Sequence, residues 1–185
     1  MSTEPPPTIW TIGHSTRPIE DFIEMLGAHA IAELVDVRTI PRSRHNPQFT
    51  IEALAQSLQT VQIQYRHMPA LGGLRTSKKD SLNTGWRNKS FRGYADYMQT
   101  EGFNTALEEL MADGRLRRTA IMCAEAVPWR CHRSLIADAL VIHGWDVRHI
   151  MTTEKADRHH LTSFAVYEND TLTYPDPGAA PRLFD

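Results

Sequence analysis

Apolar residues along this chain fall into short runs with strand-like patterns, separated by segments in which they recur every three or four positions. Runs of apolar or alternating residues, bounded by glycine, proline or polar residues, predict strands over 8–14, 31–37, 62–68, 118–124 and 144–151. Helical spacing predicts helices after residues 16, 50 and 128 and over 91–99 and 102–113. Because strands that alternate with helices pair in parallel through crossover connections, the sequence predicts a three-layer α/β fold: an open sheet of about five mostly parallel core strands flanked by helices.

The two ends of the chain depart from this pattern. Residues 1–8 are rich in proline and lack the basic and apolar regions of a secretion signal, so we expect a flexible leader before a single α/β domain over 9–185. Residues 163–174 predict an appended hairpin that turns at Asn169-Asp170. No stretch approaches the roughly 18 apolar residues of a membrane span, and two cysteines are too few for a disulfide scaffold. We therefore expect a cytoplasmic protein with free thiols and no membrane partner.

The residues at helix starts and one glycine pair predict helix caps and two places where a ligand could approach the backbone. Thr50 and either Ser15 or Thr16 are placed to cap helices, and Pro128 is expected in the first turn of the helix that carries Arg130 and Arg133. The free N–H groups of such a turn, together with the arginines, favour an anion. The Gly72-Gly73 pair permits positive φ and close approach of a ligand to the backbone.

Charge is distributed unevenly, although the chain as a whole has a net charge of only −2. Residues 36–92 contain ten Lys/Arg and three Asp/Glu, a local net charge of +7. A positive segment of this kind attracts phosphates or carboxylates, which predicts a phosphate-bearing small molecule or a nucleic acid as partner. The alternative is a solvated basic face without a ligand.

Polar side chains gather just after the predicted strands, where open α/β sheets bind their ligands. We expect them to form one site at the carboxyl edge of the sheet. After the first two strands these residues are His14, Ser15, Asp36, Arg38, Arg42 and Ser43. After the next two they are His67, Gly72, Gly73, Arg75, Cys123, Glu125, Arg130, Cys131, His132 and Arg133.

Cys123 is the candidate nucleophile of this set. A thiol at a strand end, before a helix and near arginines, is expected to have a lowered pKa. The loop is not that of a cysteine phosphatase, because Trp129 occupies the position where that motif needs arginine. The structural alternative is that Cys123 is a small buried apolar residue.

The other candidates also have two interpretations. Cys123, Cys131 and His132, with His14 or Glu125 as a fourth ligand, could hold a soft metal ion, although the spacing lacks a paired C-x2-C motif. A regulatory Cys123–Cys131 disulfide is a further alternative.

The remaining titratable candidates are His14, His67 and Asp36. Each histidine is a candidate general acid or base, or a hydrogen-bonded structural histidine. Asp36 and Arg38 face the same side of a strand, and so they form either a structural ion pair or part of a catalytic centre.

Several ordered motifs give the chain a family resemblance. They are TIGHS (11–15), LVDVRTIPRSRHNPQF (34–49), YRHMPALGG (65–73), YADYM (94–98), MCAE (122–125) and CHRSLIADAL (131–140). With these motifs the chain resembles the domain of unknown function 488 family from about Ile9 to Thr152. The resemblance implies an α/β fold with a polar pocket formed by the motifs, but it implies no reaction, substrate or cofactor.

Function must therefore be inferred from the site itself. Our leading hypothesis is an enzyme, a hydrolase or transferase, that acts on a phosphate-bearing substrate such as a nucleotide or a nucleic-acid component. The anion would be held by arginines, and Cys123, His132, His14, Asp36 and Glu125 are the candidates for nucleophilic or proton-transfer roles. A noncatalytic nucleic-acid or small-anion binding module and a metal-dependent Cys/His site are the alternatives.

Overall fold

The computed structural model describes residues 4–179 and is built around a six-stranded sheet with the strand order β3-β2-β4-β1-β5-β6. The first five strands in the sequence pair with one another in parallel, and β6 is antiparallel to β5. The strands are β1 (Thr8–Gly13), β2 (Glu33–Asp36), β3 (Gln64–His67), β4 (Thr119–Cys123), β5 (Asp146–Ile150) and β6 (Ala156–Arg158). Residues 1–3 of the predicted leader and 180–185 of the predicted domain lie outside the described residues, and this division of the chain stays a prediction.

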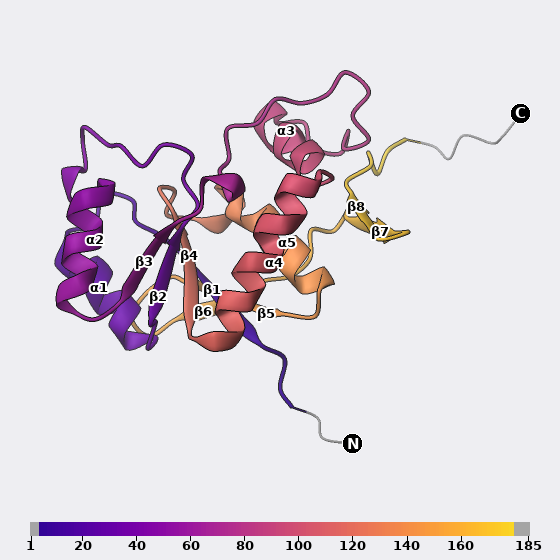
Figure 1. Cartoon of the computed structure of the whole chain (residues 1–185). Helices are drawn as coiled ribbons and strands as arrows, with labels where there is room; N and C mark the ends of the chain where they lie inside the picture. Colours follow the sequence, from indigo (N-terminus) through magenta and orange to yellow (C-terminus); the bar gives the residue numbers. More distant parts are fainter. Residues whose placement is uncertain (1–3, 180–185) are drawn as a thin grey trace, which may run out of the picture.

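Helices cover both faces of the sheet (Figure 1). Two of them, α1 (Ile19–Ala28) and α2 (Ile51–Thr60), lie on one face, where Phe22, Leu26 and Leu54 pack against Ile12 of β1. On the other face, α4 (Glu101–Leu116) and α5 (Arg133–Ile142) bury Leu110 and Leu135 in a second core. The short helix α3 (Lys89–Tyr97) contributes to that second core. The predicted three-layer α/β fold is confirmed, with β6 as an antiparallel addition at the edge.

The predicted hairpin is confirmed as β7 (Val166–Glu168) and β8 (Thr171–Thr173), which pair with each other and not with the main sheet. Its turn residues Asn169 and Asp170 have φ values of 49° and 58°. Asparagine and aspartate tolerate this left-handed conformation better than other residues with side chains, and a two-residue hairpin turn requires it. No helix within residues 4–179 combines the length and the apolar character needed to cross a membrane.

Helix starts agree only in part with the sequence predictions. Thr50 caps α2 as predicted, because its hydroxyl accepts the Ala53 N–H. The predicted Ser15 or Thr16 cap is wrong: α1 begins after Pro18, which has no side chain to accept a bond. The predicted start at Pro128 is also wrong, since Pro128–Arg130 is a separate 3-10 turn and α5 begins only at Arg133.

Gly13 ends β1 at the point where the chain passes closest to the loop after β4. A Cβ atom on Gly13 would overlap the Glu125 carbonyl group and crowd Ala126. The His14 N–H also donates to the Cys123 carbonyl at 3.0 Å, which fixes the two strand ends side by side. The sequence therefore needs glycine here to bring the residues after β1 and β4 together.

Replacing Gly13 with alanine should destabilise the protein by about 1–3 kcal/mol, because backbone atoms must move to admit the methyl group. The matched control is Gly27→Ala in α1, where an added Cβ meets no atom within 4 Å. In a helix that exchange should stabilise by about 0.5–1 kcal/mol. Urea unfolding of the two variants measures both effects, and equal stability of the two would contradict this packing.

Candidate functional site

A cavity of about 770 Å³ lies at the carboxyl edge of the sheet, between the segments that follow β1, β2 and β4. Eleven of the predicted site residues line it, namely His14, Ser15, Arg38, Arg42, Ser43, Gly73, Cys123, Glu125, Arg130, Cys131 and His132. Ser15 has a φ of 50°, a left-handed conformation that is uncommon for a residue with a side chain. The strand order thus brings most of the predicted set to one place.

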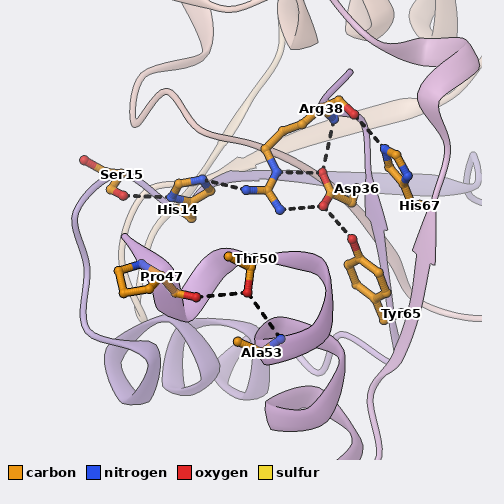
Figure 2. Close-up of polar contacts among 9 residues, drawn as sticks. All are labelled: His14, Ser15, Asp36, Arg38, Pro47, Thr50, Ala53, Tyr65 and His67. Carbon is orange, nitrogen blue, oxygen red and sulfur yellow. Dashed lines mark hydrogen bonds and ion pairs between the residues drawn. The ribbon is translucent and has the colours of Figure 1, made fainter. Parts of the chain in front are cut away.

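Asp36 and Arg38 form a buried ion pair (Figure 2), and Arg38 is the member of the pair that lines the cavity. The guanidinium donates from Nε to Asp36 Oδ1 at 2.9 Å and from Nη2 to Oδ2 at 2.6 Å. The Tyr65 hydroxyl donates to the same Oδ2 at 2.7 Å. Burial, followed by the bond to Asp36, raises the pKa of Tyr65. With both oxygens occupied and no exposed surface, Asp36 holds Arg38 in place and does not face the cavity.

His14 is tied into the same network. Its Nδ1 lies 2.7 Å from the Ser15 carbonyl oxygen, which can only accept, so Nδ1 bears the hydrogen. The lone pair of Nε2 is then free to accept from Arg38 Nη1 at 3.2 Å. The ring stacks on Phe49, and burial lowers the pKa of His14 to about 4. His14 is therefore a neutral imidazole whose two nitrogens are both engaged.

Three predicted site residues after β3 lie outside the cavity lining. His67 Nε2 donates to the Arg38 carbonyl oxygen at 2.8 Å, and Gly72 packs against Thr39, where a Cβ would clash with the threonine hydroxyl. Arg75 stacks over the Tyr97 ring at 3.6 Å and donates from Nε to the Gly72 carbonyl oxygen at 3.1 Å. These contacts fold the loop after β3 and turn Arg75 away from the cavity.

His132 reaches the cavity because Gly73 has no side chain. A Cβ on Gly73 would lie 2.6 Å from His132 Nδ1. Neither glycine of the pair adopts the positive φ that glycine permits, and the space beside Gly73 is filled by His132. His132 Nε2 donates to the Val37 carbonyl oxygen at 3.0 Å, which leaves Nδ1 unprotonated. Burial lowers the pKa of His132 to about 4, so this nitrogen is a free acceptor at neutral pH.

Arg133 lies directly behind Cys123 and is 1% exposed. Its Nε donates to Cys123 Sγ at 3.0 Å, its Nη2 to the Glu125 carbonyl oxygen at 2.6 Å and its Nη1 to Thr11 Oγ1 at 3.1 Å. Within residues 4–179, no carboxylate forms an ion pair with this guanidinium. Burial lowers the pKa of Arg133 to about 9, so the group remains charged at neutral pH. A buried charge without a carboxylate needs another counter-charge.

Cys123 and Cys131 lie side by side at the cavity wall with their sulfur atoms in contact, and their Cα atoms are 7.6 Å apart, farther than the roughly 4.4–6.8 Å of a disulfide. Cys131 Sγ also lies 3.6 Å from His132 Nδ1 and accepts the Arg133 backbone N–H at 3.5 Å. The expectation of two free thiols and the alternative of a regulatory disulfide both stay predictions. In the part of the chain that is described, no group of three or more His, Cys, Asp or Glu side chains is placed to hold a metal ion.

Arg42 and Arg130 are the exposed cations of the cavity wall. Over residues 4–179, neither guanidinium has a hydrogen-bond or ion-pair partner, in contrast to Arg38 and Arg133. Glu125 is also exposed and points its backbone oxygen to Arg133. The cavity thus offers two unpaired guanidinium groups next to a sulfur centre.

Three residues that orient the site's side chains were not among the predicted set. Tyr65 and Phe49 orient Asp36 and His14, and Thr11 accepts from Arg133. Thr11 could have been selected from the sequence, because it is a polar residue between the apolar residues Trp10 and Ile12 of a buried strand. Tyr65 and Phe49 gave no signal, since aromatic residues at such positions are usual core residues.

Replacing Asp36 with asparagine should cost about 3–5 kcal/mol, because it leaves the buried Arg38 charge without its partner. The control is Asp157→Asn, which removes a solvent-exposed pair with Lys155 and should cost at most about 1 kcal/mol. Chemical unfolding at neutral pH compares the two. Similar losses would show that the Asp36–Arg38 pair does not stabilise the site.

Stability should fall as the pH falls below about 6.5, the ordinary pKa of histidine. His14 and His132 stay neutral in the folded protein down to about pH 4, whereas the unfolded chain binds protons at both positions. Each contributes a slope of about 1.4 kcal/mol per pH unit between these values.

Unfolding free energies measured between pH 7 and pH 5 test this slope. His14→Gln should make it shallower, and His143→Gln, at an exposed position, should leave it unchanged. An unchanged slope in His14→Gln would contradict a neutral buried His14.

Comparison with known proteins agrees with the motifs around this cavity. The family model described as "Domain of unknown function DUF488" matches residues 18–140, which include every predicted site residue except His14 and Ser15. No curated protein and no solved structure matches the chain. Because the matched segment covers more than half of the chain, the protein belongs to the domain of unknown function DUF488 family.

Proposed function

We propose that this protein is an enzyme, a hydrolase or transferase, that acts on a phosphate-bearing substrate such as a nucleotide or a nucleic-acid component. Cys123 acts as the nucleophile in the reduced protein, and Arg42 and Arg130 bind the phosphate group. The observation that carries this proposal is the hydrogen bond of 3.0 Å from the buried Arg133 guanidinium to Cys123 Sγ.

The surroundings of Arg133 favour a thiolate at Cys123. Buried guanidinium groups are rarely left without an anionic partner, because desolvation of the charge is costly. Its other side-chain hydrogen bonds go to the Thr11 hydroxyl and the Glu125 backbone carbonyl oxygen, and the Glu125 carboxylate acts on it only through space. When both thiols are reduced, a negative sulfur at Cys123 supplies a counter-charge in direct contact with Arg133, and the thiolate is the nucleophilic form of cysteine.

The proposed anion site, Arg42 and Arg130, and the proposed base, His132, line the same cavity. Two exposed guanidinium groups without partners suit the oxygens of a phosphate, which arginine binds through paired N–H groups. His132 Nδ1 is an unprotonated acceptor beside the thiols, and so it can take a proton from water or from a second substrate after sulfur has formed a covalent intermediate. Glu125 is the exposed carboxylate of the cavity.

A second function, thiol–disulfide exchange, is favoured by one observation, the contact between the sulfur atoms of Cys123 and Cys131. In that reaction two electrons would pass from the dithiol to an oxidised partner, and the disulfide would form. Cys131→Ser separates the two functions, because it abolishes disulfide exchange but leaves the Cys123 nucleophile. A noncatalytic anion-binding module would show binding without turnover, and it would tolerate Cys123→Ser.

Binding of phosphate compounds is the first test. A panel of inorganic phosphate, nucleotides and oligonucleotides should contain a compound that raises the melting temperature of the reduced protein, because a ligand selective for the folded state stabilises it. Arg42→Ala and Arg130→Ala should each weaken that binding about tenfold or more, the loss of one charge-assisted contact.

Arg44→Ala is the matched control, since Arg44 is exposed, close in sequence to Arg42 and outside the cavity lining. It should bind as the wild type does. An equal loss in all three variants would point to general charge attraction, and no shift with any compound would contradict the phosphate site. Turnover of the bound compound that Cys123→Ser abolishes completes the test of the enzyme.

A further inference from the structure

A chain of buried and partly buried hydrogen bonds starts at Arg133 and crosses from β1 to β5. Arg133 Nη1 donates to Thr11 Oγ1 at 3.1 Å, and Thr11 Oγ1 lies 2.7 Å from His149 Nδ1. Thr11 on β1 and His149 on β5 are direct neighbours in the parallel register, and both are buried. The guanidinium that contacts Cys123 is therefore linked to an imidazole two strands from β4.

The chain continues to a buried carboxylate. His149 Nε2 lies 2.9 Å from His159 Nδ1, and His159 Nε2 lies 2.7 Å from Asp138 Oδ1. Asp138 has no exposed surface and also accepts from the Tyr174 hydroxyl at 2.9 Å. Asp138 belongs to α5, five residues after Arg133. The chain of hydrogen bonds therefore begins and ends on the same helix.

The carboxylate fixes the direction of every bond when both histidines are neutral. Asp138 can only accept, so His159 Nε2 bears the hydrogen and its Nδ1 accepts from His149 Nε2. His149 Nδ1 is then an acceptor, and the Thr11 hydroxyl donates to it. Thr11 in turn has its lone pairs free for Arg133, which can only donate. Each hydrogen bond thus points from the guanidinium toward Asp138.

A purely structural role explains this arrangement poorly. Each of these groups loses hydration on burial, and apolar residues of similar volume often replace buried polar networks without loss of stability. What the hydrogen bonds fix is the orientation of the Arg133 guanidinium, at the end of this chain of hydrogen bonds nearest the cavity. A guanidinium whose Nη1 and Nη2 are both held by fixed acceptors presents its Nε to Cys123 in one orientation.

We infer that Thr11, His149, His159 and Asp138 are positioning residues, which hold Arg133 against the Cys123 sulfur and so keep that sulfur in its reactive, negatively charged form. The inference rests on the proposed function of Cys123. None of the four residues lines the cavity at Cys123, so they act on substrate only through Arg133.

The experiment measures how fast iodoacetamide alkylates Cys123 in the reduced full-length protein as the pH is varied. Trypsin releases residues 119–130 as a peptide whose only cysteine is Cys123, so mass spectrometry reads this thiol separately from Cys131. The wild-type rate should reach half its maximum below neutral pH, well under the roughly 8.5 of a free thiol.

Thr11→Val should raise this midpoint by about one pH unit or more, because the buried Nη1 loses its acceptor and Arg133 is no longer held. Thr11→Ser, which keeps the hydroxyl, should restore the wild-type midpoint. The matched control is Thr119→Val on β4, which removes a buried hydroxyl that contacts Glu33 at the other end of the sheet. Its midpoint should equal that of the wild type.

A second pair of variants tests the far end of the chain. Asp138→Asn should shift the midpoint in the same direction as Thr11→Val, whereas Tyr174→Phe removes a bond to the same carboxylate from outside the chain and should not. Wild-type midpoints in both Thr11→Val and Asp138→Asn would overturn the inference. A wild-type protein that itself titrates like a free thiol would instead overturn the proposed function of Cys123, whatever the variants do.

Discussion

The buried guanidinium of Arg133 is the constraint on which the site depends. It lies at the start of α5, between the sulfur of Cys123 on β4 and the hydroxyl of Thr11 on β1. A charge at this depth requires fixed polar partners on every side, and these partners come from two strands and the loop after β4. The close contact of Gly13 with the Glu125 backbone and the chain through His149 to Asp138 therefore serve the same purpose.

A second buried pair organises the opposite wall of the cavity. Asp36 holds Arg38 in a two-point contact, and Arg38 donates to His14. The guanidinium groups of Arg38 and Arg133 are thus engaged in hydrogen bonds. Those of Arg42 and Arg130 line the cavity and have no partner within residues 4–179. In the proposed function, the arginines that build the site are distinct from those that bind the substrate, and the sequence prediction did not separate the two groups.

The alternation of apolar runs and helical segments was enough to predict the α/β class, the five parallel strands and the hairpin at Asn169. The rule that ligands bind beyond the carboxyl ends of such strands selected residues of which most line one cavity. Helix starts were less predictable, because Pro128 forms a 3-10 turn and Arg133 begins the helix only after Cys131 and His132. The partners of Arg75, Arg133 and His14 depend on contacts between distant segments, which spacing along the chain does not encode.

In the proposed function, the Arg133 charge keeps Cys123 as a thiolate. Ultraviolet absorbance of the reduced protein at neutral pH detects the thiolate, and Cys123→Ser isolates the signal of that sulfur. We expect a thiolate signal in the wild type that disappears in Cys123→Ser and is lost at neutral pH in Arg133→Met. A wild type without the signal, or a signal that persists in Arg133→Met, would show that Arg133 does not hold a thiolate at Cys123.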